Sequence, residues 1–116
     1  MTNIADLVRE SAAARPDHPA LVTRTTELTW AEVDQRVDRA ARALTQAGLT
    51  RGSRVALMIG NRPEILACLF AAAEPGMVAV PLNTGYTTTE VTRLCVDAEV
   101  EILLYDTAST KVGASV

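Results

Sequence analysis

The order of apolar and polar positions along the chain predicts alternating strands and helices in its central part. Short runs at Val55–Ile59, Met77–Val80 and Glu101–Tyr105 have the length and apolar character of buried strands. Apolar residues recur at helical spacing after Pro63, and Pro63 suits a first helical position because it lacks an N–H. Apolar residues recur in the same way after Thr87, which begins a capping-box pattern. Strands joined through a helix pair in parallel. The order therefore predicts an α/β fold, a mostly parallel sheet with βαβ units flanked by helices.

The first part of the chain predicts a helix and a hairpin. Asn3 is placed to cap a helix that ends before Pro16, since the residue before a proline avoids the helical region. Ala20–Thr23 and Glu27–Thr29 are short enough and close enough to form two antiparallel strands.

A second capping box, Thr29 with Glu32, predicts a helix that runs to about Ala47 and stops at Gly48. Along this helix, Glu32–Arg36 and Asp38–Arg42 have the spacing of surface ion pairs.

Gly76 is expected to end the helix that begins at Pro63. Pro75 removes a backbone donor from its last turn, so that end should be tightened or frayed. We divide the chain into residues 1–105, an α/β subdomain, and residues 106–116, which carry no strong period and are expected to be a frayed tail or the start of a further segment.

Composition limits the function classes. A chain of 116 residues that is 48% hydrophobic, 22% charged and 3% aromatic is one ordinary globular domain or a piece of one. The net charge of −3 and the lack of a basic stripe argue against nucleic-acid binding. No basic and apolar leader begins the chain, and its most apolar window, Ile65–Leu82, is broken by Glu74, Pro75 and Gly76, so we expect no membrane span and a cytoplasmic location.

The residues that usually carry chemistry do not form an active site in this sequence. Cys68 and Cys95 lie on separate predicted helices and are expected to be buried thiols, with a disulfide or metal pair as the alternative. His18 lies in a predicted exposed turn between Asp17 and Pro19. No metal-binding motif is present, and we expect no metal site in this chain.

Two turns are candidates for ligand contact. Gly60–Arg62 and Asn83–Tyr86 each follow a predicted parallel strand and precede a helix, so both should lie at the carboxyl edge of the sheet, where open α/β sheets bind ligands. The helix N-termini there attract anions, although turn chemistry alone also explains these residues. A phosphate-receiving regulator would need an acidic cluster at these strand ends, and Gly60–Asn61 and Leu82–Asn83 supply none.

Four segments carry a resemblance to a known family: HPALV at 18–22, LTWAEVDQRVDRAARAL at 28–44, RVALMIGNRPEIL at 54–66 and GMVAVPLNTGYTTTEV at 76–91. With them the chain resembles, in one collinear order from about Ile4 to Tyr105, the N-terminal part of the adenylate-forming enzymes, and most closely the acyl-CoA ligases of fatty and aryl acids.

This resemblance implies a two-step ligase. A carboxylate attacks the α-phosphorus of ATP to give an acyl-adenylate and pyrophosphate, with Mg²⁺ neutralising phosphate charge, and the thiol of CoA then displaces AMP. In such enzymes the ATP-binding loop, the ribose-binding motif and a late lysine follow the segment that this chain matches. We therefore expect an N-terminal fragment, inactive alone, that binds none of these cofactors tightly.

The resemblance also suggests which residues contact CoA. The loop after the second parallel strand lies near the CoA channel in related ligases, which maps onto Asn83, Thr84 and Gly85. Some relatives have an arginine where Gly85 stands, placed for a CoA phosphate, and this sequence lacks it. The expected partners are the remainder of the ligase and a small carboxylic acid, and we allow for a homo-oligomer.

The alternative is a free-standing α/β module that binds an anionic small molecule or a complementary polypeptide at the strand edge. A fragment should leave an apolar face or a strand edge that a missing segment would cover, whereas a self-contained module should not.

Overall fold

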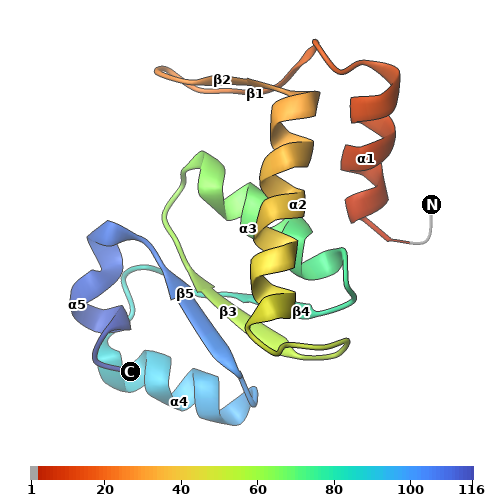
Figure 1. The fold of residues 1–116 in the computed structure, drawn as a ribbon. Coiled ribbons are helices and arrows are strands. Elements are labelled where there is room, and N and C mark those ends of the chain that lie inside the picture. Colours follow the sequence, from red (N-terminus) through yellow and green to blue (C-terminus); the bar gives the residue numbers. More distant parts are fainter. Residues whose placement is uncertain (1–2) are drawn as a thin grey trace.

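A computed structural model describes residues 3–116 (Figure 1). The elements follow in chain order: α1 (Ala5–Ala14), β1 (Pro19–Val22), β2 (Glu27–Thr29), α2 (Trp30–Gln46), β3 (Arg54–Met58), α3 (Pro63–Ala73), β4 (Val78–Pro81), α4 (Thr88–Asp97), β5 (Ile102–Tyr105), a 3₁₀ helix η1 (Thr107–Ser109) and α5 (Thr110–Gly113). The predicted order of strands and helices is confirmed, and the three predicted parallel strands lie within one residue of their observed bounds.

The central sheet has the strand order β4-β3-β5, and both pairings are parallel. Val55 of β3 lies opposite Ala79 of β4 and Ile102 of β5. The α/β fold with a parallel sheet is therefore confirmed. No helix within residues 3–116 is long and apolar enough to cross a membrane.

Strand β3 is buried on both faces. Val55 and Leu57 belong to the core formed with α2 and α3, while Ala56 and Met58, which alternate with them, are equally buried on the opposite face. Figure 1 shows α4 on the side of the sheet away from α3. The molecule therefore has a helix, sheet, helix arrangement with β3 at its centre.

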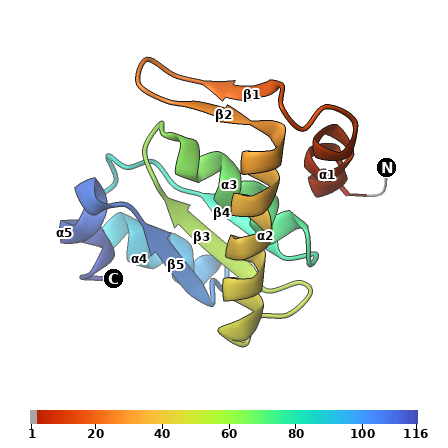
Figure 2. The same ribbon diagram turned by 45° about the horizontal axis from the view of Figure 1, so that its top comes forward.

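Strands β1 and β2 form the predicted antiparallel hairpin, which is separate from the parallel sheet (Figure 2). The first strand begins at Pro19 and ends at Val22, one residue earlier than expected at each end. Both views place the hairpin at one end of α2, beside the start of α3.

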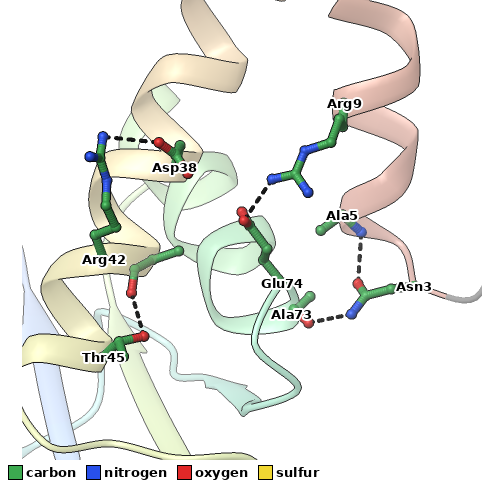
Figure 3. Close-up of polar contacts among 9 residues, drawn as sticks. Asn3, Ala5, Arg9, Asp38, Arg42, Thr45, Ala73 and Glu74 are labelled. Atoms are coloured by element: carbon green, nitrogen blue, oxygen red, sulfur yellow. Dashed lines mark hydrogen bonds and ion pairs between the residues drawn. The ribbon is translucent and has the colours of Figure 1, made fainter.

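Asn3 ties the start of the chain to the end of α3 (Figure 3). Ile4, not Asn3, occupies the N-cap position of α1, so the predicted capping is shifted by one residue. The Asn3 Oδ1 accepts the Ala5 N–H at 2.9 Å, and its Nδ2 donates to the Ala73 carbonyl. The Asn3 side chain thus bonds the first turn of α1 and also joins it to the end of α3.

Two ion pairs lie on the exposed faces of α1, α2 and α3. Arg9 contacts Glu74 at 2.7 Å, and the predicted pair of Arg42 with Asp38 is present at 2.9 Å (Figure 3). Because these charges are solvated, each pair contributes about 1 kcal/mol or less to stability.

The capping box at α2 is confirmed. The Thr29 Oγ1 accepts the Glu32 N–H at 3.2 Å, and the Glu32 Oε1 accepts the Thr29 N–H at 3.0 Å. Hydrogen bonding with Thr29, and to a smaller extent the charge of Arg36, lowers the pKa of Glu32. The predicted Glu32–Arg36 ion pair is nevertheless wrong, since within residues 3–116 Arg36 has no ion-pair partner at 4.0 Å or less.

The end of α3 is tightened, as Pro75 and Gly76 predict. Gly76 has a φ of +83°, its N–H donates to the Ala73 carbonyl at 3.0 Å, and the Met77 N–H donates to the Ala72 carbonyl at 2.9 Å. This pair of hydrogen bonds closes the helix through a residue in the left-handed conformation, which glycine adopts without strain.

The segment after β5 is not frayed. It forms η1 and α5, in which Ser109 and Gly113 are buried. An ideal Cβ on Gly113 would lie 2.3 Å from the Cγ of Tyr105, so α5 packs directly against the ring of a β5 residue. The expectation of a frayed tail is therefore wrong, because close backbone packing orders a segment without a helical period.

Candidate functional site

The carboxyl ends of the three parallel strands lie at one edge of the sheet. Leu57 lies opposite Pro81, and Met58 lies opposite Tyr105. The turns that follow therefore share this edge, as the sequence predicts, and the segment that begins at Asp106 joins them there.

The carboxylate of Asp106 occupies the turn between β3 and α3. Its Oδ2 accepts the Gly60 N–H at 2.8 Å, and its Oδ1 accepts the Ser109 N–H at 2.9 Å, which makes Asp106 the N-cap of η1. The Nε of Arg62 lies 3.9 Å from Oδ2, and the Asp106 side chain is 6% exposed. Hydrogen bonding from Gly60 above all, then from Ser109, together with the charge of Arg62, lowers the pKa of Asp106.

The Gly60–Arg62 turn thus receives an anion from its own chain. The Gly60 N–H is engaged by Asp106, so it is not free for a ligand anion, which favours the turn-chemistry interpretation of Gly60–Arg62 that the sequence left open. Sequence reasoning missed Asp106. Its signal was present, because an aspartate after a strand and three residues before Ser109 is a helix-start pattern. A single carboxylate here does not form the acidic cluster of a phosphate-receiving regulator.

Asp106→Asn is expected to reduce the acid dependence of stability. The lowered pKa means that ionised Asp106 stabilises the fold at neutral pH, and this contribution is lost as pH falls from about 5 through the folded-state value. Asparagine keeps an acceptor for Gly60 or Ser109 but cannot ionise. Urea unfolding at pH 7 and pH 3.5 should show a smaller pH difference for the variant than for the natural chain. An equal difference would show that Asp106 does not couple to folding.

The loop after β4 is open to solvent. Asn83, Thr84 and Gly85 are all exposed. The Asn83 Oδ1 accepts the Gly85 N–H at 2.7 Å, and the Tyr86 N–H donates to the Asn83 carbonyl at 3.1 Å, which closes a compact turn. The three residues proposed from the resemblance therefore form a defined, accessible loop, and their contact with CoA stays a prediction.

The helix that follows this loop satisfies its own first turn. The Thr87 Oγ1 accepts the Glu90 N–H at 3.2 Å, and the Glu90 Oε1 accepts the Thr87 N–H at 3.0 Å, which confirms the predicted capping box. Hydrogen bonding from Thr87 lowers the pKa of Glu90. An anion that approached α4 would therefore meet a carboxylate at its N-terminus, which makes the loop itself the better contact surface.

The residues of this edge do not fit a complete site for ATP and Mg²⁺. The chain has one lysine, Lys111, and it lies on α5. Within residues 3–116 no group of three or more His, Cys, Asp and Glu side chains is arranged to hold a metal ion. We therefore derive no step of an ATP-dependent reaction from this chain's residues.

The remaining candidates are two thiols and one histidine. Cys68 and Cys95 are free, half-buried thiols on α3 and α4. Burial, and for Cys68 also the charge of Glu64, raises the pKa of each thiol, which makes both poor nucleophiles. His18 is exposed in its turn, as expected.

Comparison with known proteins identifies the family. The family model described as AMP-binding enzyme matches residues 8–115. The chain belongs to the AMP-binding enzyme family. Among curated members, it is 33% identical over 114 residues to the long-chain-fatty-acid–CoA ligase FadD13 of Mycobacterium tuberculosis, and 39% identical over 80 residues to a feruloyl-CoA synthase of an Amycolatopsis species.

The structural comparison agrees with this family. The N-terminal domain of FACL13 from Mycobacterium tuberculosis superposes with a TM-score of 0.92 at 32% identity, covering 97% of this chain and 29% of that one. The chain also covers 23% of the FadD13 sequence and 16% of the feruloyl-CoA synthase. It therefore spans less than a quarter of the curated relatives that it matches, and its fold is that of part of an N-terminal ligase domain.

Proposed function

We propose that this chain is the N-terminal α/β part of an ATP-dependent acyl-CoA ligase. In the complete reaction a carboxylate attacks the α-phosphorus of ATP, which releases pyrophosphate and forms an acyl-adenylate, and the CoA thiol then displaces AMP to form the thioester. The observation that carries the proposal is the family match over residues 8–115, together with the fit to the N-terminal domain of a fatty-acid–CoA ligase. A free-standing module is not favoured, because nearly the whole chain matches this family.

An apolar groove beside the sheet supports the idea that further polypeptide completes the fold. A hollow of about 220 Å³ lies between α2 and the β5 side of the sheet. Apolar side chains and one thiol line it: Ala40, Ala43, Leu44, Ala47, Cys68, Ile102 and Leu104. Within residues 3–116, β4 and β5 each pair only with β3, which leaves both outer edges unpaired. A fragment is expected to leave such a face and such edges.

The remainder of the ligase is the proposed partner, joined covalently or as a split protein. ATP, Mg²⁺, CoA and a small carboxylic acid are the proposed ligands of the whole enzyme. We further propose that it acts in the cytoplasm and that association into a homo-oligomer is compatible with it.

The isolated chain is expected to release no pyrophosphate from ATP in the presence of Mg²⁺, CoA and a fatty or aryl acid. The physical reason is that the chain has a single lysine, on α5, and that no group of side chains within residues 3–116 is arranged to hold a metal ion. A coupled pyrophosphate assay, with FadD13 as the positive control, checks this. Release that rises in proportion to the concentration of the pure chain would overturn the proposal.

Gly85→Arg is expected to strengthen CoA binding if Asn83, Thr84 and Gly85 form the CoA-side wall. Gly85 has no positive φ, and an ideal Cβ would lie 3.2 Å from the Asn83 Oδ1, so a side chain fits after a small shift of that amide. In a hybrid in which this chain replaces the matched segment of FadD13, the KM for CoA should fall about two- to fivefold at low salt.

Thr50→Arg is the matched control, because it adds the same charge at an exposed position before β3, at the opposite end of that strand from the carboxyl edge. An equal fall in the KM for CoA in both variants would indicate a general charge effect. The assignment of the loop to the CoA site would then be wrong.

A further inference from the structure

A partly enclosed cavity of about 150 Å³ lies under the β1–β2 hairpin. The hairpin contributes Leu21 and Leu28, the first turn of α2 contributes Trp30, and α3 contributes Ala67 and Phe70. Both ribbon views show the hairpin at one end of α2, near the start of α3. None of the residues 83–85 lines the cavity, so it is separate from the proposed CoA-side loop.

The size and lining of the cavity suit a small apolar group. Nearly all of its wall is carbon, and Leu28 at its base is 4% exposed. Apolar cavities of about 150 Å³ stay dry and can hold one benzene molecule. A ring or a short alkyl chain therefore fits this space without displacing well-bound water.

One charged side chain, Arg36, lies among the lining residues. Arg36 follows Glu32 by one helical turn, but the Glu32 carboxylate accepts the Thr29 N–H, and Arg36 has no ion-pair partner at 4.0 Å or less among residues 3–116. Because nearly all of the cavity wall is carbon, Arg36 lines it chiefly with its methylene stem, and its exposed guanidinium, whose charge also acts on Glu32, is left to contact a ligand at the cavity mouth. This arrangement is complementary to a molecule with an apolar body and one anionic end.

We propose that this cavity binds a small aryl or short alkyl anion, with its apolar part between Trp30 and Phe70 and its anionic group at Arg36. The proposal rests on the cavity and on Arg36, and does not depend on the proposed ligase function. It assigns a specific role to the exposed guanidinium, which the sequence alone places on a solvated helix face.

Trp30 is the one tryptophan of the chain and lines the cavity, so its fluorescence reports binding directly. Titration of the full chain with 4-iodobenzoate, a heavy-atom quencher, should give saturable quenching. The neutral analogue 4-iodobenzamide should bind several-fold more weakly. Quenching that rises linearly without saturation for both compounds would be collisional and would overturn the proposal.

Two variant pairs locate the site. Ala67→Met should weaken 4-iodobenzoate binding at least tenfold by filling the cavity, whereas Ala13→Met, at an exposed position of α1, should not. Arg36→Gln should reduce the affinity for 4-iodobenzoate to that for the amide, whereas Arg39→Gln on the same helix should leave it unchanged. Both arginines are exposed, so these variants keep the test valid even if Ala67→Met fails to fold. Loss of binding in the two control variants, or none in the two cavity variants, would overturn the proposal.

Discussion

Leu57→Ala is expected to lower the free energy of unfolding by about 3 kcal/mol, the middle of the range for a fully buried leucine. Leu57 lies in the central strand, is fully buried, and packs in the core shared by the sheet, α2 and α3. Strand β3 pairs on both sides, so the strand cannot move to fill the space that the smaller side chain leaves. Urea unfolding followed by circular dichroism measures the loss.

Leu94→Ala is the matched control for this prediction. Leu94 is 39% exposed on α4, so the same change there should cost about 1 kcal/mol or less. Equal losses for the two variants would contradict the placement of β3 at the centre of the core.

Gly113→Ala is expected to release α5 from the sheet, at a cost of about 1–3 kcal/mol typical of overpacking. The added Cβ would lie 2.3 Å from the Tyr105 Cγ, so the overlap is relieved only if the Tyr105 ring leaves its rotamer or α5 moves. Alanine normally stabilises a helix over glycine by about 0.8–1 kcal/mol, so helix propensity alone would make the variant more stable. A lower free energy of unfolding would therefore come from the contact with Tyr105. Hydrogen exchange should rise in residues 106–116 and change little in β3.

A double-mutant cycle tests the cause. In a Tyr105→Ala background the ring is absent, so Gly113→Ala should cost little or should stabilise the short helix. The same cost in both backgrounds would mean that the contact between α5 and Tyr105 is not responsible.

The parts of the fold that short stretches of sequence determine were predicted well. Thr29 with Glu32 and Thr87 with Glu90 each formed the expected capping box, because both partners lie within one helical turn. Gly76 ended α3 through a left-handed conformation that its own neighbours require. The three parallel strands followed from apolar runs separated by helices.

The errors involve contacts between residues that are distant in sequence or groups that compete for one partner. The Glu32 carboxylate closes the capping box with the Thr29 N–H and forms no ion pair with Arg36, although the spacing suits either partner. Residues 106–116 carry no helical period, and their order comes from the approach of Gly113 to Tyr105. Local sequence patterns show neither which distant residues come into contact nor which of two possible partners a group chooses.

The sequence predicted that the candidate site lies at the carboxyl edge of the sheet, but not which of the two turns there is accessible to a ligand. The parallel order placed Gly60 and Asn83 after neighbouring strands. In the folded chain Asp106, which is distant in sequence, engages the Gly60 N–H, while the loop at Asn83 stays exposed. The exposed loop is therefore the better candidate for ligand contact.

The central claim is that these residues build one part of an acyl-CoA ligase whose reaction is completed by other polypeptide. Thioester formation by the hybrid with FadD13 tests it most directly, measured with ATP, Mg²⁺, CoA and a long-chain fatty acid. We expect the purified hybrid to make acyl-CoA, while FadD13 that lacks the matched segment makes none. A hybrid that folds, as judged by cooperative unfolding, and still makes no acyl-CoA would contradict the account.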